Sequence, residues 1–397
     1  MIATRRFDVT PSAWSDLLRA LRFQYFKWDT YACGGCLVLP EAMVLSPQAH
    51  AQVIGIVEAL HAALVRFERQ ARREPDTLRR LGIPEALYPL IAREEERPLG
   101  LARYDLFLTE DDRWMVSEFN EDVPGGFNEA VGLPDLLPPG PGAAWAGDLR
   151  AGVLDALAAY DAVALLYATG FSEDLQHMLL LERWLQDAGH ATVLGSVAHL
   201  TRGFRRPRIL GVPVDAAFRF YPGEWMPRLP NLATWLKLGP GLPMMNPLRH
   251  LIRQSKTVFA WWREHPGTSA ADRALVERHC PRTVPFSAAA ATSARSERER
   301  WVLKRAFGRM GDAVVMGMLV SEQEWDLAVA EAARAPGEWC FQERFSVRPL
   351  EFEAGMLYPA VGAFVVNGRF AGYYSRAAER PLITHQAYHV GTLVQSA

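Results

Sequence analysis

The chain has 397 residues and a formal net charge of −2, and 49% of its residues are hydrophobic against 22% charged. This length predicts two or three packed units, and the near-neutral charge argues against a surface built to attract nucleic acid or anionic lipid. The most apolar stretch, residues 162–171, is too short for a spanning helix, and the first residues carry no signal-like apolar segment. We therefore expect a cytoplasmic protein, and an enzyme by its size.

The first third of the chain is predicted to be helical and to end in a hairpin. Residues 11–27 and 46–73 carry apolar side chains at helical spacing, and each stretch has a proline near its start. Residues 101–109 and 113–120 are two strand-like runs joined by three acidic residues. That pattern is typical of two paired antiparallel strands.

The middle of the chain has the pattern of a parallel α/β unit. An apolar run at 161–168 is followed by a helical pattern at 172–188 and a second strand at 191–195. Two parallel strands need such a crossover helix between them. A hairpin-like stretch at 208–221 and a helix at 251–264 are expected to follow.

The last third is predicted to mix strands with one helix, at residues 321–333. The Ala/Ser-rich run at 287–296 is interpreted as a linker or mobile loop. Strands are expected at residues 301–304, 313–318, 339–345, 362–366 and 370–375.

Polar residues in the predicted hairpin suggest a cation site. Alternate residues of a strand share one face, so Arg103 and Asp105 point together, as do Glu118 and Asn120. Pairing of the strands can bring Asp105, Glu118 and Asn120 within reach of one cation. Two carboxylates and an amide oxygen suit a Mg²⁺ ion that also binds phosphates. The alternative is an exposed polar strand face.

A Pro-Gly-Gly turn follows the hairpin directly, after the acidic pair Glu121-Asp122. The backbone amides of Gly125 and Gly126 are unshielded and can approach a substrate closely. We expect Asp122, Gly125 and Gly126 to contact the substrate, and an ordinary loop is the alternative.

Lysine occurs only four times in the chain, at Lys27, Lys237, Lys256 and Lys304. Lys304 ends a predicted strand and precedes a Gly-x-x-Gly loop at 308–311, which can fold over phosphates while the lysine supplies a point charge. The string of a Walker P-loop is absent.

Cys33 and Cys36 form one C-x-x-C string. A structural zinc site needs a second pair of ligands, which the neighbouring sequence does not offer. We interpret the string as a turn with incidental thiols, and a metal or redox site is the alternative.

Taken in order, these strings resemble the glutathionylspermidine synthase family over roughly residues 100 to 390. They comprise Arg103-Tyr-Asp105, Glu118-Phe-Asn120-Glu-Asp122-Val-Pro-Gly125-Gly126, Phe220-Tyr-Pro-Gly-Glu224-Trp225, Ser255-Lys256, Lys304 with Gly308-Arg309-Met-Gly311, Gln342-Glu343, and Gly372-Tyr-Tyr-Ser-Arg376.

The resemblance implies an α/β (α+β) protein with an ATP-grasp fold, in which the site elements are permuted so that the metal ligands precede the nucleotide lysines. It implies three parts. Residues 1–160 hold the N-terminal helices and the metal-binding hairpin, which pack with the C-terminal part. Residues 161–245 form a pre-ATP-grasp-like α/β unit, and residues 246–397 carry the nucleotide-binding lysines, the Gly loop and the hinge.

The resemblance also implies a role for each residue of the site. Asp105, Glu118 and Asn120 would bind Mg²⁺, and Lys256 and Lys304 would contact the phosphates of ATP. Gly308, Arg309 and Gly311 would belong to the loop that closes over the phosphates, and Gln342 and Glu343 would lie at the adenine hinge. Arg103 and Arg376 would hold the substrate carboxylate or the transferring phosphoryl group. Glu224 would lie near the substrate amine.

The implied activity is that of an ATP-dependent carboxylate–amine ligase that forms an amide through an acyl phosphate. Its substrates would be a peptide or amino-acid carboxylate and an amine, with no nucleic acid or membrane partner. A non-catalytic module that binds ATP and Mg²⁺ is the alternative. Two departures stand out: we expect a synthetase-only type without the amidase domain, and Gly223 stands where tryptophan is usual.

Overall fold

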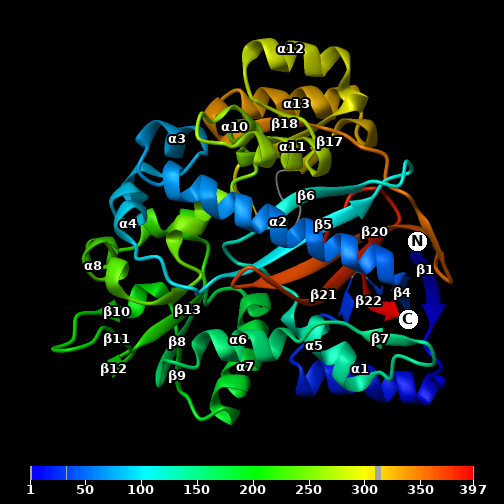
Figure 1. Ribbon diagram of the computed structural model, residues 1–397, viewed down its shortest axis with the longest axis horizontal. Helices are drawn as coiled ribbons and strands as arrows, with labels where there is room; N and C mark the ends of the chain where they lie inside the picture. The colour runs from blue at the N-terminus through cyan, green and yellow to red at the C-terminus, as the bar shows by residue number, and fades with distance from the viewer. Residues whose placement is uncertain (1, 33, 309–313, 397) are drawn as a thin grey trace.

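The computed structural model describes residues 2–32, 34–308 and 314–396 and shows a mixed α/β protein, which confirms the predicted class (Figure 1). A large mixed sheet occupies the centre, with a small parallel sheet below it and a small antiparallel sheet above it (Figure 1). Within the described part of the chain, no helix is long and apolar enough to cross a membrane.

The large sheet joins the two ends of the chain. Its strands lie in the order β1 (Ile2–Arg6), β4 (Val38–Leu45), β22 (Tyr388–Gln395), β21 (Arg369–Ala378), β20 (Gly355–Val366), β5 (Leu101–Leu108) and β6 (Trp114–Asn120), with β7 (Ala143–Trp145) on β22 and β19 (Leu350–Phe352) on β20. Neighbouring strands are antiparallel except β4 and β22, which are parallel. The predicted hairpin, β5 and β6, therefore pairs with a strand from the last tenth of the chain.

The two faces of this sheet bury different side chains. Helix α2 (Pro47–Ala71) crosses one face (Figure 1), and its apolar stripe packs in one core with Tyr104 and Leu106 of β5. Helices α5 (Phe127–Leu136) and α6 (Leu149–Leu157) cover the other face and share a second core with Leu101 and Phe364. Because side chains alternate along a strand, the intervening residues of β5 point to this second face.

The parallel α/β unit is present as predicted. Its strands lie in the order β14 (Met244–Met245), β13 (Ala216–Phe220), β8 (Ala162–Tyr167) and β9 (Ala191–Gly195), all parallel, and α7 (Ser172–Asp187) connects β8 to β9. Of the predicted hairpin at 208–221, only β11 (Arg208–Ile209) and β12 (Val212–Pro213) pair with each other. The fully buried residues of β13 leave the hairpin and join the parallel sheet.

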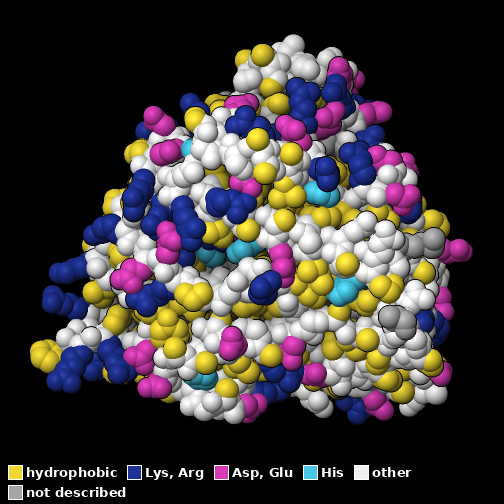
Figure 2. Space-filling model, viewed as in Figure 1, with side chains coloured by type: hydrophobic (Ala, Val, Ile, Leu, Met, Phe, Trp, Pro, Cys, Tyr) yellow, Lys and Arg dark blue, Asp and Glu magenta, His cyan; other side chains and the backbone are white. Residues whose placement is uncertain are grey.

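Strands β11 and β12 form a separate small sheet with β10 (Leu200–Thr201). This sheet projects from the body of the molecule (Figure 1), and arginine side chains gather at its end (Figure 2).

The small antiparallel sheet has the order β15 (Thr283–Pro285), β18 (Trp339–Glu343), β16 (Trp301–Arg305) and β17 (Val314–Met316), and α12 (Ala288–Ser296) and α13 (Glu322–Ala332) pack on it. The interpretation of 287–296 as a linker was wrong. Alanine is the strongest helix former, and Ser287 caps the helix by accepting a hydrogen bond from the amide of Ala290 at 3.1 Å.

The helix predicted at 251–264 is broken into α9 (Leu251–Gln254) and α10 (Val258–Glu264). At the break, the hydroxyl of Ser255 donates to the carbonyl of Leu81 at 2.7 Å, and the amide of Lys256 donates to the carbonyl of Ala306 at 2.9 Å. These bonds replace helical ones and attach Lys256 to the end of β16.

The remaining elements lie around these sheets. They are α1 (Pro11–Gln24), β2 (Tyr31–Ala32), β3 (Gly35–Cys36), α3 (Pro75–Arg80), α4 (Tyr88–Arg93), α8 (Leu232–Leu238) and α11 (Ala270–His279), with 3-10 turns η1 (Glu85–Leu87), η2 (Val197–His199), η3 (Gly223–Arg228), η4 (Gly239–Gly241), η5 (Leu248–His250), η6 (Arg298–Arg300), η7 (Gly317–Leu319) and η8 (Pro336–Glu338). The helices predicted at 11–27 and 46–73 are confirmed to within a few residues.

Candidate functional site

A cavity of about 260 Å³ lies where the large sheet meets the two smaller ones. Its walls come from β5 and β6, from β16 and β18, from the segment 381–387, from the first turns of α7, and from residues 27–29. Stretches that lie far apart in the sequence therefore meet around one space.

The hairpin supplies the acidic part of the wall. Asp105 of β5 lies opposite Glu118 of β6. Both carboxylate oxygens of Asp105 accept from Arg103, at 2.7 and 3.0 Å, and one also accepts from Arg376 at 3.3 Å and from the amide of Asn120 at 3.2 Å. Burial would raise the pKa of Asp105, but Arg103 outweighs burial and lowers the pKa below its usual value. Asp105 is therefore an anion at neutral pH.

A β-bulge in the hairpin receives one of the lysines. The β5–β6 register shifts between Asp105 and Leu106, which leaves Ser117 as an extra residue on β6. The carbonyl of Ser117 accepts a hydrogen bond at 3.0 Å from Nζ of Lys304. A bulge interrupts the regular ladder and re-aims the groups beside it, and here it links the hairpin to the end of β16.

The second lysine lies beside the same hairpin, because Nζ of Lys256 is 2.8 Å from Oε1 of Glu118. Burial favours the neutral acid, yet Lys256 lowers the pKa of Glu118 overall. Burial also lowers the pKa of Lys304, to about 8. The charge of Glu118 opposes this shift, and the charge of Lys256 adds to it. Two lysines therefore lie beside one carboxylate. Lys304 and Glu118 line the cavity, whereas Lys256 does not.

The residues predicted for the adenine hinge line the cavity on β18. The amide of Gln342 donates to the hydroxyl of Thr283 at 3.4 Å, and Glu343 pairs with Arg300 at 2.9 Å. Gly308 also lines the cavity, whereas Arg309 and Gly311 lie outside the described residues. The wall around them is largely apolar and includes Phe107, Val302, Val314, Met316, Phe345 and Ile383.

The Gly125-Gly126 turn lies in the cavity wall and is held from both sides. Nε2 of His177 accepts from the amide of Gly126 at 2.8 Å, while Nδ1 lies 2.7 Å from the carbonyl of Glu173. Burial lowers the pKa of His177 to about 4, so the ring is neutral and can accept. Gly126 has φ +102°, and a Cβ there would lie 2.5 Å from the ring of Tyr374. Only glycine fits this position.

Asp122 and Glu224, predicted to bind substrate, are not among the residues that line the cavity. Asp122 is buried in an ion pair with Arg219 and accepts from the amide of Gly223 at 2.9 Å. Glu224 is close to Asp122, and burial together with that neighbouring charge raises its pKa to about 7. Both residues lie behind the turn and join it to η3.

Six further residues that were not predicted as site residues also line the cavity. They are Lys27, Asp29, Glu129, His177, Tyr374 and His389. The rarity of lysine was the available signal for Lys27, but nothing in a local pattern connects residues 27–29 with α5, α7 and β22.

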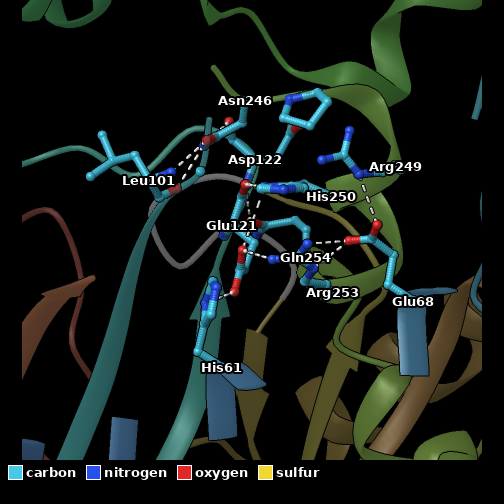
Figure 3. Close-up of polar contacts among 12 residues, drawn as sticks. His61, Glu68, Leu101, Glu121, Asp122, Asn246, Arg249, His250, Arg253 and Gln254 are labelled. Carbon is cyan, nitrogen blue, oxygen red and sulfur yellow. Dashed lines mark hydrogen bonds and ion pairs between the residues drawn. The ribbon is translucent and has the colours of Figure 1, made fainter. Parts of the chain in front are cut away.

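A buried polar network holds the loop that follows the hairpin (Figure 3). Arg253 pairs with Glu68 of α2 and, at 3.2 Å, with Glu121. Glu121 also accepts from the hydroxyl of Tyr104 at 2.5 Å, and the side-chain oxygen of Gln254 accepts from the amides of Glu121 and Asp122 at 2.7 and 3.0 Å. The backbone between the hairpin and the Pro-Gly-Gly turn is thereby fixed from behind.

Asp105, Glu118 and Asn120 present two carboxylates and an amide on adjacent strands, which is a donor set of hard oxygens that suits Mg²⁺. Within residues 2–32, 34–308 and 314–396, no cluster of three His, Cys, Asp or Glu side chains could hold a metal by itself. The residues fit a Mg²⁺ ion whose coordination is completed by phosphate oxygens or water.

Residues 150–395 match the family described as "Glutathionylspermidine synthase preATP-grasp". No curated protein matches the sequence. Among solved structures, "Putative gamma-glutamylcysteine synthetase from METHYLOBACILLUS FLAGELLATUS KT" is 12% identical and has a TM-score of 0.48, with 83% of this chain and 88% of that chain covered.

Replacement of Arg253 by methionine should destabilise the protein by about 3–5 kcal/mol, because Glu68 and Glu121 would lose their shared buried partner. Chemical denaturation measures this loss. The matched control is Arg369→Met, which removes an 84% exposed side chain at 3.5 Å from Glu58 and should cost less than about 1 kcal/mol. Equal losses in the two variants would contradict the role assigned to the network.

Proposed function

Because the chain belongs to the glutathionylspermidine synthase family, we propose that it is an ATP-dependent ligase that joins a small-molecule carboxylate to an amine. The observation that supports this proposal is the convergence of two lysines on the acidic hairpin: Lys304 lines the cavity with Asp105 and Glu118, and Lys256, which does not line it, pairs with Glu118. Two buried ammonium groups beside two carboxylates suit a polyphosphate that carries a divalent cation.

In this proposal, ATP spans the cavity from β18 to the hairpin. Its adenine lies against the apolar wall near Gln342 and Glu343, and its phosphates reach Lys304 in the wall and, beside Glu118, Lys256. Gly308, which lines the cavity, would lie over the phosphates. Each lysine exchanges its contact with Glu118 or Ser117 for a phosphate oxygen. Asp105, Glu118 and Asn120 would hold Mg²⁺, which supplies charge neutralisation when it is bound.

The carboxylate substrate would lie against Arg103 and Arg376, which meet at Asp105. An oxygen of this carboxylate attacks the terminal phosphorus of ATP, the bond to ADP breaks, and an acyl phosphate forms. The amine then adds to the acyl carbon, phosphate leaves, and the nitrogen loses one proton. The guanidinium groups stabilise negative charge on the transferring phosphoryl group. Gly125 and Gly126 border the same space, although the amide of Gly126 is already donated to His177.

A non-catalytic module that binds ATP and Mg²⁺ is the second candidate function. The same lysines and carboxylates would support it, and turnover alone separates the two.

The Asp105→Asn variant tests the proposed activity. Release of ADP should be measured with Mg–ATP over a panel of peptide and amino-acid carboxylates combined with primary amines. With the carboxylate and amine that the wild type accepts, the variant should have a kcat roughly 10²–10³ times lower, because the negative charge of Asp105 on the cation-binding strand is lost. Asp111→Asn, on the exposed turn of the same hairpin, is the matched control. Nucleotide binding without ADP release in any pair would instead favour the binding module.

Lys304 should make nucleotide binding depend on pH. Its pKa is about 8, and a phosphate beside it raises that pKa, so binding at pH 8 should take up about half a proton. The protonated form binds phosphate better, and affinity should therefore fall as the pH rises above 8. Calorimetry in buffers of different ionisation enthalpy measures the uptake.

The Lys304→Met variant should remove this proton uptake and weaken nucleotide binding. The matched variant Lys237→Met, on the distant helix α8, should leave both the proton uptake and the nucleotide affinity unchanged. Binding at pH 8 with no linked proton in the wild type would rule out contact between Lys304 and the phosphates.

A further inference from the structure

A second charge cluster lines another part of the cavity wall. Nζ of Lys27 lies 2.7 Å from Oε1 of Glu129 and 2.9 Å from the carboxylate of Asp29, and Nδ1 of His389 lies 3.2 Å from the same oxygen of Glu129. Lys27 and Glu129 are each 4% exposed, whereas the side chain of Asp29 is 38% exposed. Asp29 is therefore the carboxylate of this cluster that a ligand can reach most easily.

The cluster carries a net negative charge. Burial lowers the pKa of His389 to about 4, as it does for His177, so both rings are neutral near pH 7. Lys27 outweighs burial and lowers the pKa of Glu129 to about 2. One ammonium thus faces two carboxylates, and half-buried Glu173 adds a third to the cavity wall nearby. Within the described part of the chain, no hydrogen bond or ion pair engages the carboxylate of Glu173.

This negative end is continuous with the positive part of the cavity. The hydroxyl of Tyr374 lies 3.1 Å from Nδ1 of His389, and its ring lies under the guanidinium groups of Arg103 and Arg376, at 5.1 and 5.6 Å. One aromatic side chain therefore separates the two ends. A molecule that reacts near Arg103 can extend past Tyr374 to reach Asp29 and Glu173.

We propose that Asp29, Glu129 and Glu173 form the subsite for an ammonium group of the amine substrate. The inference rests on the proposed function and deepens it. Three carboxylates against one ammonium leave an excess of negative charge in this wall, and an ammonium group offers three donors to such a set. Asp29 and Glu129 precede the matched residues 150–395, so this subsite depends on a part of the chain outside the family match.

The geometry favours this place over Glu224. Glu224 does not line the cavity, and it shares its surroundings with Asp122 and Arg219 behind the Gly125-Gly126 turn. Asp29 and Glu173 lie in the wall itself, and the amide of Trp28 donates to the side chain of Gln176 at 3.1 Å, which ties the segment that carries Asp29 to α7.

The direct test is binding of 1,4-diaminobutane by calorimetry, without nucleotide, to the wild type and to single variants. Asp29→Asn and Glu173→Gln should each weaken binding about tenfold, since each removes a charge-assisted hydrogen bond. Asp187→Asn, at the exposed far end of α7, is the matched control and should not change it. Uncharged n-butanol should not bind, and thermal unfolding of each variant verifies that it is folded.

Binding and turnover together separate the two proposals. If the wild type is a ligase, Asp29→Asn should raise the KM for the amine about tenfold and leave the KM for ATP unchanged. If the diamine binds in a way that depends on Asp29 but the protein releases no ADP with any substrate pair, the subsite proposal stands and the ligase proposal is refuted. Equal diamine affinity in the wild type and both variants, or no binding at all, would overturn the subsite. A loss confined to Glu224→Gln would move it to Glu224.

Discussion

Pairing of buried carboxylates with cations from distant parts of the chain determines the geometry of the cavity. A charge removed from water is tolerated only when a partner lies at hydrogen-bond distance, so each pair fixes the elements that carry it. The main pairs are Asp105 with Arg376, Glu118 with Lys256, Asp122 with Arg219, Glu121 with Arg253, and Glu129 with Lys27. Every one of them joins segments that lie far apart in the sequence.

The same pairs distribute charge unevenly along the cavity. Around the hairpin, four cationic side chains face two carboxylates, and at the far end one cation faces two carboxylates with a third nearby. The apolar wall beside β18 completes the sequence of environments. In the proposed function, a nucleotide, a carboxylate and an ammonium group would occupy these three environments in that order. Neutral His177 holds the glycine turn by accepting from the amide of Gly126.

The sequence was informative where the pattern is local. The alternation of side chains predicted that Arg103, Asp105, Glu118 and Asn120 would share a face, and the structure places them together. The strand–helix–strand spacing at 161–195 gave the parallel unit. The ordered strings identified the family, which the match over residues 150–395 confirms. The roles of the individual residues in binding ATP and Mg²⁺ remain predictions.

The sequence failed where tertiary contacts override a local pattern. The helical periodicity of 251–264 does not reveal that Ser255 and Lys256 bond to Leu81 and Ala306 instead of continuing the helix. The segment 287–296 is a different case, because its alanines favour a helix and Ser287 caps it, so the local signal was present and was misinterpreted. Lys27 and Glu129 meet only because α1 and α5 pack together, which no single stretch encodes.

A crystal structure with Mg²⁺ and a non-hydrolysable ATP analogue tests the central claim most directly. We expect the phosphates to lie within hydrogen-bond distance of Nζ of both Lys256 and Lys304, with the metal between them and the carboxylates of Asp105 and Glu118. The account would be contradicted by a nucleotide bound elsewhere. It would also be contradicted if Lys256 kept its contact with Glu118 and Lys304 kept its contact with the carbonyl of Ser117 while the nucleotide was bound.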